Sequence, residues 1–210
     1  IMIANLDIIF PEIFLSVSIF AVLMLGVFIK NSFNIIFNLT SIIIILTLSI
    51  IFNSPNDKEK IFLDSFVRDP FSNYFKVLIL LASLFVLNSS KKFISENRLN
   101  KFEYPIIILL SILGMFFMVS ANDLILFYLG LELQSLALYI LASIDRDNLR
   151  STESGIKYFV LSALSSGLLL YGCSLLYGFT GSTNFDLISN QLTKGNIGAV
   201  FAMVFILVGL

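Results

Sequence analysis

One carboxylate, Glu132, lies in the middle of a long apolar segment that runs from Asp123 to Ser143. Burying an ionisable group at membrane depth costs at least about 2.5 kcal/mol, even on lenient insertion scales. By helical rise Glu132 is ~13 Å beyond Asp123, close to the midplane of a bilayer. A membrane chain that accepts this cost generally uses the group to move a proton or an ion. Glu132 is therefore the first candidate for a catalytic residue in proton translocation.

Four further polar side chains are expected on the same helical face as Glu132. They stand at offsets of −4, +3, +7 and +11 and are Tyr128, Ser135, Tyr139 and Ser143. Residues at these spacings share one face of an α-helix, so they form a polar stripe that can hold water and hydrogen-bond partners for the carboxyl group. The alternative is a structural glutamate paired with a neighbouring helix, and the functional interpretation is favoured over it.

A second candidate, Lys157, belongs to the next apolar segment, near the end that we expect to face inward. Lys157 is ~8 Å from that end by helical rise, whereas Glu132 is ~18 Å from it. This difference in depth of about 10 Å predicts a relay through water rather than a direct salt bridge. The alternative is a lysine that snorkels toward the inner interface.

The other charges beside apolar segments are expected to be structural. Glu12 is predicted to be interfacial, and Lys76 to snorkel toward the outer end of the third segment. Asp123 should open the fifth helix, where the helix dipole favours a carboxylate. Ser151, with Glu153 in the following turn, is predicted to cap the sixth helix.

The composition is that of a membrane protein. Of 210 residues 58% are hydrophobic and 13% charged, with a mean hydropathy of +0.96, whereas soluble domains are about 45–50% apolar and 25% charged. The apolar runs are continuous and longer than the ~10-residue alternating strands of a membrane β-barrel. An all-α, polytopic transmembrane protein is therefore predicted.

Charge and residue types exclude several functions. The formal net charge of −1 provides no basic field for nucleic acid. The sequence has no histidine and one cysteine, Cys173, so an internal disulfide and the usual zinc, haem and iron–sulfur ligand spacings are excluded.

Six full hydrophobic segments and a partial seventh are expected within a single membrane domain of residues 1–210. The partial segment reaches only ~21 Å against a hydrocarbon core of ~30 Å, which predicts a truncated polypeptide. Pro70 and Pro105 suit helix starts. The expected segments are 8–29, 35–52, 71–87, 105–121, 123–144, 155–179 and, in part, 197–210.

Two of the polar connections are long. Residues 53–70 are expected to form a mixed loop with an amphipathic piece at the interface, because Ile61, Phe62, Phe66 and Val67 fall near one helical face. Residues 180–196 have ordinary turn chemistry.

Loop charges favour an N-terminus on the outer side. This orientation places seven basic residues inside and four outside. The inner ones are Lys30, Lys91, Lys92, Arg98, Lys101, Arg146 and Arg150, and the outer ones are Lys58, Lys60, Arg68 and Lys194.

Two long stretches carry a family resemblance. FYLGLELQSLALYILAS (Phe127–Ser143) and the segment from Ser151 to Phe185, which contains IKYFVLSA, closely resemble subunit N of proton-pumping NADH–quinone oxidoreductase. That subunit is NADH dehydrogenase subunit 2 in mitochondrial complex I. The wording of these motifs is closer to subunit N than to its paralogues, subunits L and M, or to sodium/proton antiporter subunits.

The resemblance implies the N-terminal portion of an antiporter-like, fourteen-helix fold. It equates Glu132 with the family's essential glutamate of the fifth helix and Lys157 with its sixth-helix lysine. The family's next pumping lysine, on a broken seventh helix, is expected just beyond Leu210. The implied activity is proton translocation coupled to electron transfer from NADH to quinone, in a bacterial plasma membrane or a mitochondrial inner membrane.

The resemblance also implies partners and cofactors. This chain would hold no cofactor, and NADH, FMN, iron–sulfur clusters and quinone would bind to other subunits. The expected partners are other membrane subunits of complex I, including an adjacent antiporter-like subunit and small membrane subunits, together with lipids. A subunit of a related cation/proton antiporter and a structural membrane subunit are the alternatives.

Overall fold

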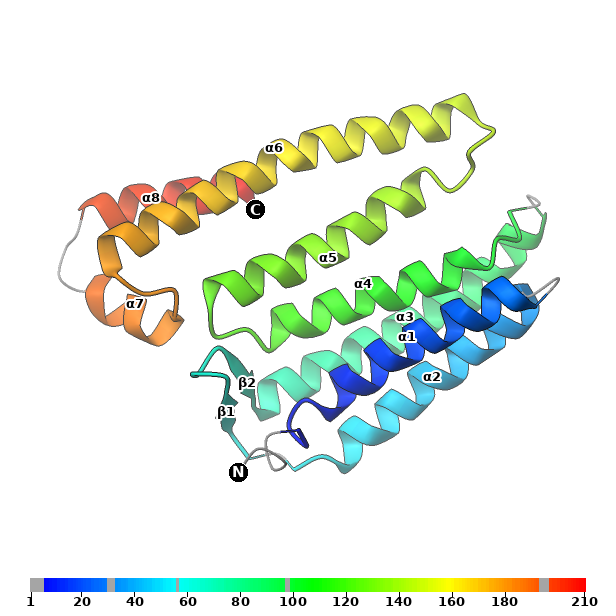
Figure 1. Cartoon of the computed structure of the whole chain (residues 1–210), viewed down its shortest axis with the longest axis horizontal. Helices are drawn as coiled ribbons and strands as arrows, with labels where there is room; N and C mark the ends of the chain where they lie inside the picture. The colour runs from blue at the N-terminus through cyan, green and yellow to red at the C-terminus, as the bar shows by residue number, and fades with distance from the viewer. Residues whose placement is uncertain (1–5, 30–32, 56, 97–98, 193–196) are drawn as a thin grey trace.

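The computed structural model describes residues 6–29, 33–55, 57–96, 99–192 and 197–210. Over these residues the chain forms eight helices and one antiparallel hairpin, with the long helices side by side in an elongated bundle (Figure 1). The elements are α1 (Phe10–Phe28), α2 (Phe33–Asn53), β1 (Glu59–Ile61), β2 (Phe66–Arg68), α3 (Pro70–Glu96), α4 (Glu103–Val119), α5 (Leu124–Ala142), α6 (Leu149–Thr180), α7 (Phe185–Leu192) and α8 (Ile197–Gly209).

Five of these helices, α1, α2, α3, α5 and α6, are long and apolar enough to cross a membrane. Two shorter apolar helices accompany them: α4 has 17 residues and α8 has 13. At 1.5 Å per residue α4 reaches ~26 Å of a ~30 Å hydrocarbon core. The prediction of a multi-pass helical membrane protein is confirmed.

The main core lies between α1, α2, α3 and α4. Each contributes a narrow buried stripe, while large apolar side chains on the outer faces remain exposed, as lipid-facing residues should be. Fully buried members of the stripes are Leu15, Ile36, Leu80, Leu109 and Phe116. Helix α5 continues this bundle on α4, and α6 then packs with α8 in a second, smaller core around Leu169 and Leu176.

Helices α4 and α5 approach each other closely at two glycines. A Cβ added at Gly130 would lie 2.8 Å from the Gly114 carbonyl oxygen and 2.8 Å from the Met118 amide nitrogen. A Cβ at Gly114 would lie 2.7 Å from the Gly130 carbonyl oxygen. Small residues of this kind allow membrane helices to pack backbone against backbone, which replaces the hydrophobic driving force that is missing between helices in lipid. This contact sets the position of the helix that carries Glu132.

The structure corrects the prediction for Lys76, which pairs with Glu12 instead of snorkelling. Neither side chain reaches solvent: Glu12 is 2% exposed and Lys76 1%, and their Oε1 and Nζ atoms form an ion pair of 2.6 Å between α1 and α3. Burying both charges removes the freedom to snorkel, and their mutual attraction offsets the desolvation that each would suffer alone.

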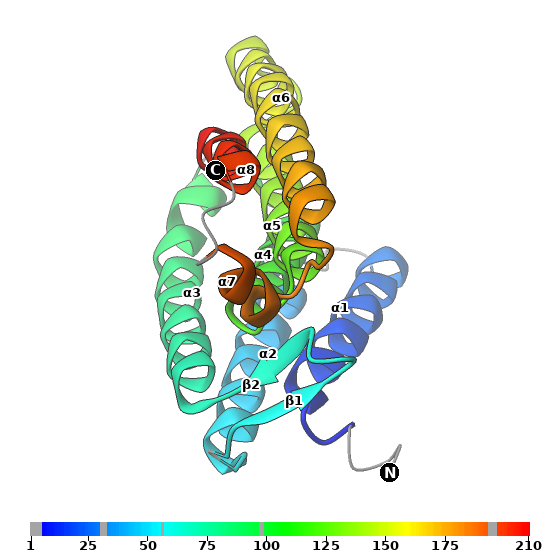
Figure 2. The same ribbon diagram turned by 90° about the vertical axis from the view of Figure 1, so that its left-hand side faces the viewer.

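Residues 53–70 contain a β-hairpin instead of the expected amphipathic helical piece. Glu59 pairs with Arg68, and Ile61 with Phe66. Three successive non-glycine residues at its tip, Phe62, Leu63 and Asp64, have positive φ of 53°, 55° and 64°. Ile61 and Phe66 are buried, so alternation along two short strands, and not a helical period, accounts for the apolar residues here. Figure 2 shows the hairpin lying across one end of the bundle. We call this the outer end and the opposite one the inner end, following the orientation that the loop charges predict.

Two helix boundaries and one connection also differ from the sequence-based predictions. Helix α3 ends at Glu96 and α6 begins at Leu149, so both extend well beyond their apolar cores. The cap of α6 is Asn148, whose side chain accepts a hydrogen bond from the Arg150 amide, and not Ser151. The connection after α6 contains the short helix α7. Three of the basic residues counted for orientation, Lys30, Arg98 and Lys194, lie outside the described residues.

Three connections meet at the outer end and form a hydrogen-bonded junction. The Asp64 carbonyl in the hairpin accepts the side-chain amides of Asn122, at 2.9 Å, and Asn184, at 3.2 Å. The Asp186 carboxylate accepts a hydrogen bond of 3.1 Å from the Asn122 side-chain amide and forms an ion pair of 2.5 Å with Lys60. The hairpin, the α4–α5 turn and the start of α7 are therefore tied together.

Asp123, in the α4–α5 turn, caps α5 as predicted. Its Oδ1 accepts the Ile125 amide at 2.8 Å, and Oδ2 accepts the Thr183 hydroxyl at 2.5 Å. One carboxylate thus begins α5 and holds it to the segment after α6.

We predict that Gly130→Ala destabilises the subunit by roughly 1–3 kcal/mol, because the new methyl group must push α4 away from α5. The measurement is the thermal stability of the full-length subunit in detergent. Gly167→Ala is the matched control, since nothing described lies within 4 Å of a Cβ at that position. Equal stability of the two variants would contradict the close approach.

The junction should loosen in acid. The hydrogen bond from Lys60 lowers the pKa of Asp186, as does that from Asn122, and the same Lys60–Asp186 bond raises the pKa of Lys60. The stabilisation that ionised Asp186 gives to the junction is therefore present above the ordinary pKa of Asp186. It is lost as pH falls through the lowered value, below about pH 4. The stabilisation that protonated Lys60 gives to the junction is lost only as pH rises through the raised pKa of Lys60.

We therefore expect hydrogen exchange at the Asn122 and Phe185 amides, corrected for intrinsic rates, to rise at acid pH and to stay constant near neutrality. Asp186→Asn should raise exchange at neutral pH and remove the acid step. An unchanged acid step in this variant would show that another group controls the junction.

Candidate functional site

Glu132 lies on the face of α5 that points away from α4. It is two residues beyond Gly130, or about 200° around the helix, from the glycine that contacts α4. This rotation around the helix axis places Glu132 on the face of α5 that contacts α6 through Tyr128 and Tyr139. Its side chain is partly buried, and its Oε1 atom is fully buried without a hydrogen-bond partner among the described residues.

The predicted polar stripe on α5 faces α6. The Tyr128 hydroxyl forms a hydrogen bond of 3.1 Å with the Ser166 hydroxyl. Toward the inner end, the Tyr139 ring contacts the ring of Tyr158 edge to face, with centroids 4.7 Å apart. Below it, a Cβ on Gly155 would lie 2.5 Å from the Cβ atom of Ser143. The stripe is therefore an interhelical surface and not a lipid-facing one.

These contacts place Glu132 relative to α6. Interpolation between the Tyr128–Ser166 and Tyr139–Tyr158 contacts puts Glu132 at the level of Ser162 and Ala163. A buried carboxylate oxygen at mid-helix, with no partner among the described residues and beside a hydroxyl-bearing stretch of the next helix, is suited to bind water or a cation that enters between the two helices.

Lys157 does not reach this position. It lies six residues before Ala163 on α6, which is ~9 Å nearer the inner end, in agreement with the predicted difference in depth. Its side chain is 69% exposed and forms an ion pair of 2.5 Å with Glu153, one turn toward the inner end. The direction of the side chain is that expected for snorkelling. A relay from Lys157 to Glu132 stays a prediction that requires intervening water.

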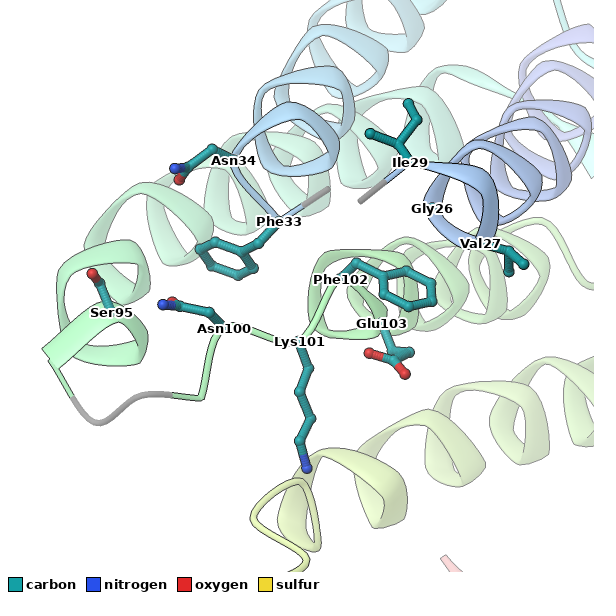
Figure 3. Close-up of a pocket in the computed structure, with 10 residues that line it drawn as sticks. All are labelled: Gly26, Val27, Ile29, Phe33, Asn34, Ser95, Asn100, Lys101, Phe102 and Glu103. Atoms are coloured by element: carbon teal, nitrogen blue, oxygen red, sulfur yellow. The ribbon is translucent and has the colours of Figure 1, made fainter. Parts of the chain in front are cut away.

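A pocket of about 670 Å³ occurs at the inner end of the bundle, away from Glu132 (Figure 3). Asn34, Ser95, Asn100 and Glu103 are among its lining residues. Lys101, also on the pocket, extends its ammonium group to the Ile144 carbonyl, 2.7 Å away, and so ties the start of α4 to the end of α5. This contact closes the inner end of the α4–α5 pair, as the Asp123 turn closes the outer end.

Sequence reasoning missed the Glu12–Lys76 pair. The available signal was one acidic and one basic residue near the outer ends of two apolar segments. Opposite charges at similar depth on antiparallel or adjacent helices are candidates for pairing. Which helices are adjacent depends on the tertiary structure. The sequence could therefore suggest Glu12 and Lys76 as a candidate pair but could not identify them as partners.

Comparison with known proteins assigns this arrangement to a family of membrane complexes. Residues 121–210 match the family model described as NADH:quinone oxidoreductase/Mrp antiporter, TM. This range contains Glu132, Lys157 and the whole α5–α6 interface.

The chain is 55% identical over 207 residues to NADH-quinone oxidoreductase subunit N of Pelagibacter ubique. The resemblance to subunit N is confirmed. This match covers 98% of the chain and 44% of the relative, so the chain spans less than half the length of that subunit.

Solved structures with a similar fold come from the same kinds of membrane complex. A chain of respiratory complex I from Thermus thermophilus matches with a TM-score of 0.77 and 26% identity, covering 95% of this chain and 42% of that one. A chain of the Mrp complex from Dietzia matches with a TM-score of 0.72 and 20% identity, covering 97% and 40%. The antiporter-like membrane fold is thus shared by a chain of respiratory complex I and a chain of an Mrp complex.

Proposed function

We propose that this chain is part of a membrane-arm subunit of respiratory complex I that takes part in proton translocation coupled to electron transfer from NADH to quinone. The observation that carries the proposal is the buried Oε1 atom of Glu132 at the middle of α5, which has no hydrogen-bond partner in the part of the chain that the structure describes. This residue lies within the segment that matches the family model. The identity to subunit N over nearly the whole chain supports the assignment to complex I.

In this proposal Glu132 works by changing its charge balance with the groups around it. A nearby cation favours the ionised carboxylate, and withdrawal of the cation favours uptake of a proton. The α5–α6 interface supplies the hydroxyls of Tyr128 and Ser166, which can orient water toward the carboxylate. Lys157 would exchange charge with Glu132 through such water, because ~9 Å of depth separates them.

The chain's role in the enzyme is that of a translocase component. Electron transfer and the binding of NADH, FMN, iron–sulfur clusters and quinone would belong to other subunits of the complex. The partners would be those other membrane subunits, an adjacent antiporter-like subunit among them, and lipids. The bacterial source of the subunit N relative favours a bacterial plasma membrane over a mitochondrial one.

The competing function is cation/proton antiport in a related complex, which the likeness to the Mrp complex supports at the level of fold. A second competitor is a membrane scaffold whose charges only fix helix packing. The Oε1 atom of Glu132, which has no hydrogen-bond partner among the described residues, weighs against the scaffold, since a buried structural glutamate should have both oxygens bonded.

We predict that Glu132→Gln in the intact subunit lowers proton translocation by at least about tenfold, equivalent to ~1.4 kcal/mol in a rate-limiting barrier. The amide has nearly the same shape but carries no charge, so assembly should persist. Proton uptake driven by NADH in membrane vesicles measures translocation, and blue-native electrophoresis measures assembly.

Glu96→Gln is the matched control for this variant. Glu96 is an exposed carboxylate paired with Lys92 at 3.9 Å, and its replacement should leave translocation unchanged. Full pumping by Glu132→Gln would reject the proton-translocation role, and sodium-dependent transport without NADH oxidation would favour the antiporter.

A milder effect is expected for Lys157→Gln. Because the ammonium group is exposed and paired with Glu153, its loss should reduce translocation by only a few fold, less than the loss of the Glu132 charge. The same vesicle assay with Glu153→Gln as a parallel variant separates the role of Lys157 from that of the ion pair. A loss as complete as that of Glu132→Gln would place Lys157 on the main proton path.

A further inference from the structure

A second cluster of buried charges lies at the outer end of the bundle, away from Glu132. Glu12 of α1 and Lys76 of α3 form its centre, with their Oε1 and Nζ atoms 2.6 Å apart. Arg68, from the hairpin, is 4% exposed and lies close enough to interact with the charge of Glu12. The four-helix core and the hairpin together therefore enclose two cations and one anion.

Two aromatic rings lie close to the Lys76 ammonium in addition to Glu12. Its ammonium lies 5.3 Å from the ring centre of Phe66 and 5.7 Å from that of Phe116. These cation–π contacts stabilise the charge but accept no conventional hydrogen bond. A lysine ammonium has three donors, and Glu12 is the one ion-pair partner of Lys76 within the described residues.

Four buried polar atoms of Glu12 and of the neighbouring elements have no hydrogen-bond partner within the described residues. They are Glu12 Oε2, Arg68 Nε, Asn73 Nδ2 and Ser120 Oγ. All four residues are at least nine-tenths buried, with exposures of 2%, 4%, 8% and 1% in that order. The set contains both donors and acceptors, so no single ion could satisfy all of them.

Short separations along the helices and one backbone hydrogen bond link these residues. Asn73 lies one turn before Lys76 on α3, and Ser120 lies one turn after Phe116 on α4. The Ser120 carbonyl accepts the Val67 amide at 2.8 Å, which holds the strand that carries Arg68 against the end of α4.

A pocket of about 720 Å³ opens next to this cluster at the outer end. Arg68 belongs to both, and the pocket also touches Pro11, the chain neighbour of Glu12. Its polar lining residues are Asp7, Ser49, Asn53, Ser54 and Glu59. The Arg68 guanidinium donates a hydrogen bond of 2.6 Å to Glu59, another lining residue of the pocket.

We propose that the cluster is a binding site for ordered water, which joins Glu12 Oε2 to Arg68, Asn73 and Ser120 and connects the buried ion pair to the outer aqueous phase. Buried water characteristically makes about three hydrogen bonds to polar groups that otherwise lack partners. Neutral water can donate to the carboxylate and accept from the amide and guanidinium, which matches the mixed set. A dry cluster would leave a buried ion pair with its remaining polar groups unpaired, the arrangement in which desolvation exceeds attraction.

The site gives the chain a second hydrated carboxylate that is independent of Glu132. Glu12 lies three residues into α1 and Glu132 in the middle of α5, and different helices surround them. The proposal of water at Glu12 therefore holds even if Glu132 has a purely structural role.

The test is a cryo-EM map of the full-length subunit in its complex, at a resolution that shows ordered water. We expect water within hydrogen-bond distance of Glu12 Oε2 and of at least one of Arg68 Nε, Asn73 Nδ2 and Ser120 Oγ. Well-defined density without water there, or protein groups bonded to all four atoms, would overturn the proposal.

Matched variants test which residues hold the water. Ser120→Ala should remove the water bound to the hydroxyl, and Asn73→Leu should displace the one bound to the amide. Ser83→Ala is the control, because the buried Ser83 hydroxyl already donates to the Leu80 carbonyl at 3.0 Å and its loss should leave the outer water unchanged. If Asn73→Leu does not assemble, Ser120→Ala decides alone: water that persists unaltered in it contradicts the assignment.

Discussion

The outer end of the bundle depends on the buried attraction between Glu12 and Lys76. Lys76 also lies against the ring of Phe66, so the pair fastens the hairpin as well as α1 and α3. The hairpin in turn holds the α4–α5 turn through the Asn122 amide and side chain. Within that turn Asp123 begins α5 and sets the depth of Glu132. A chain of polar contacts thus runs from one buried charge to the start of the helix that carries the other.

The position of Glu132 is set by the packing of α5, since no described residue hydrogen-bonds to its buried Oε1 atom. The glycine contact with α4 fixes the rotation of α5, and the tyrosines of the polar stripe fix its register against α6. Helix packing in lipid relies on such close contacts and interhelical hydrogen bonds because apolar burial supplies little driving force there. The result is a carboxylate held at a defined place with an oxygen left open for water or a cation.

The helices and their membrane character followed from local composition. Runs of apolar residues, the capping role of Asp123 and the shared face of Tyr128, Glu132 and Tyr139 all depend on spacing along one helix, and the structure agrees with each. The hairpin was missed because Ile61 and Phe66 suit either a helical face or two short strands. The partners of Lys76 and Lys157 were equally open, since a long flexible side chain can snorkel or pair.

The sequence by itself determined that this is a multi-pass helical protein, that it resembles subunit N, and that Glu132 stands at the middle of its fifth predicted segment. These properties follow from the hydropathy, the motif sequences and the residue spacing within single segments. Tertiary structure alone decided that Glu12 meets Lys76, that the polar stripe faces α6, and that Lys157 turns to Glu153. Each of these depends on which segments are neighbours in space, and the energy of a buried charge is set by that neighbourhood rather than by its own sequence.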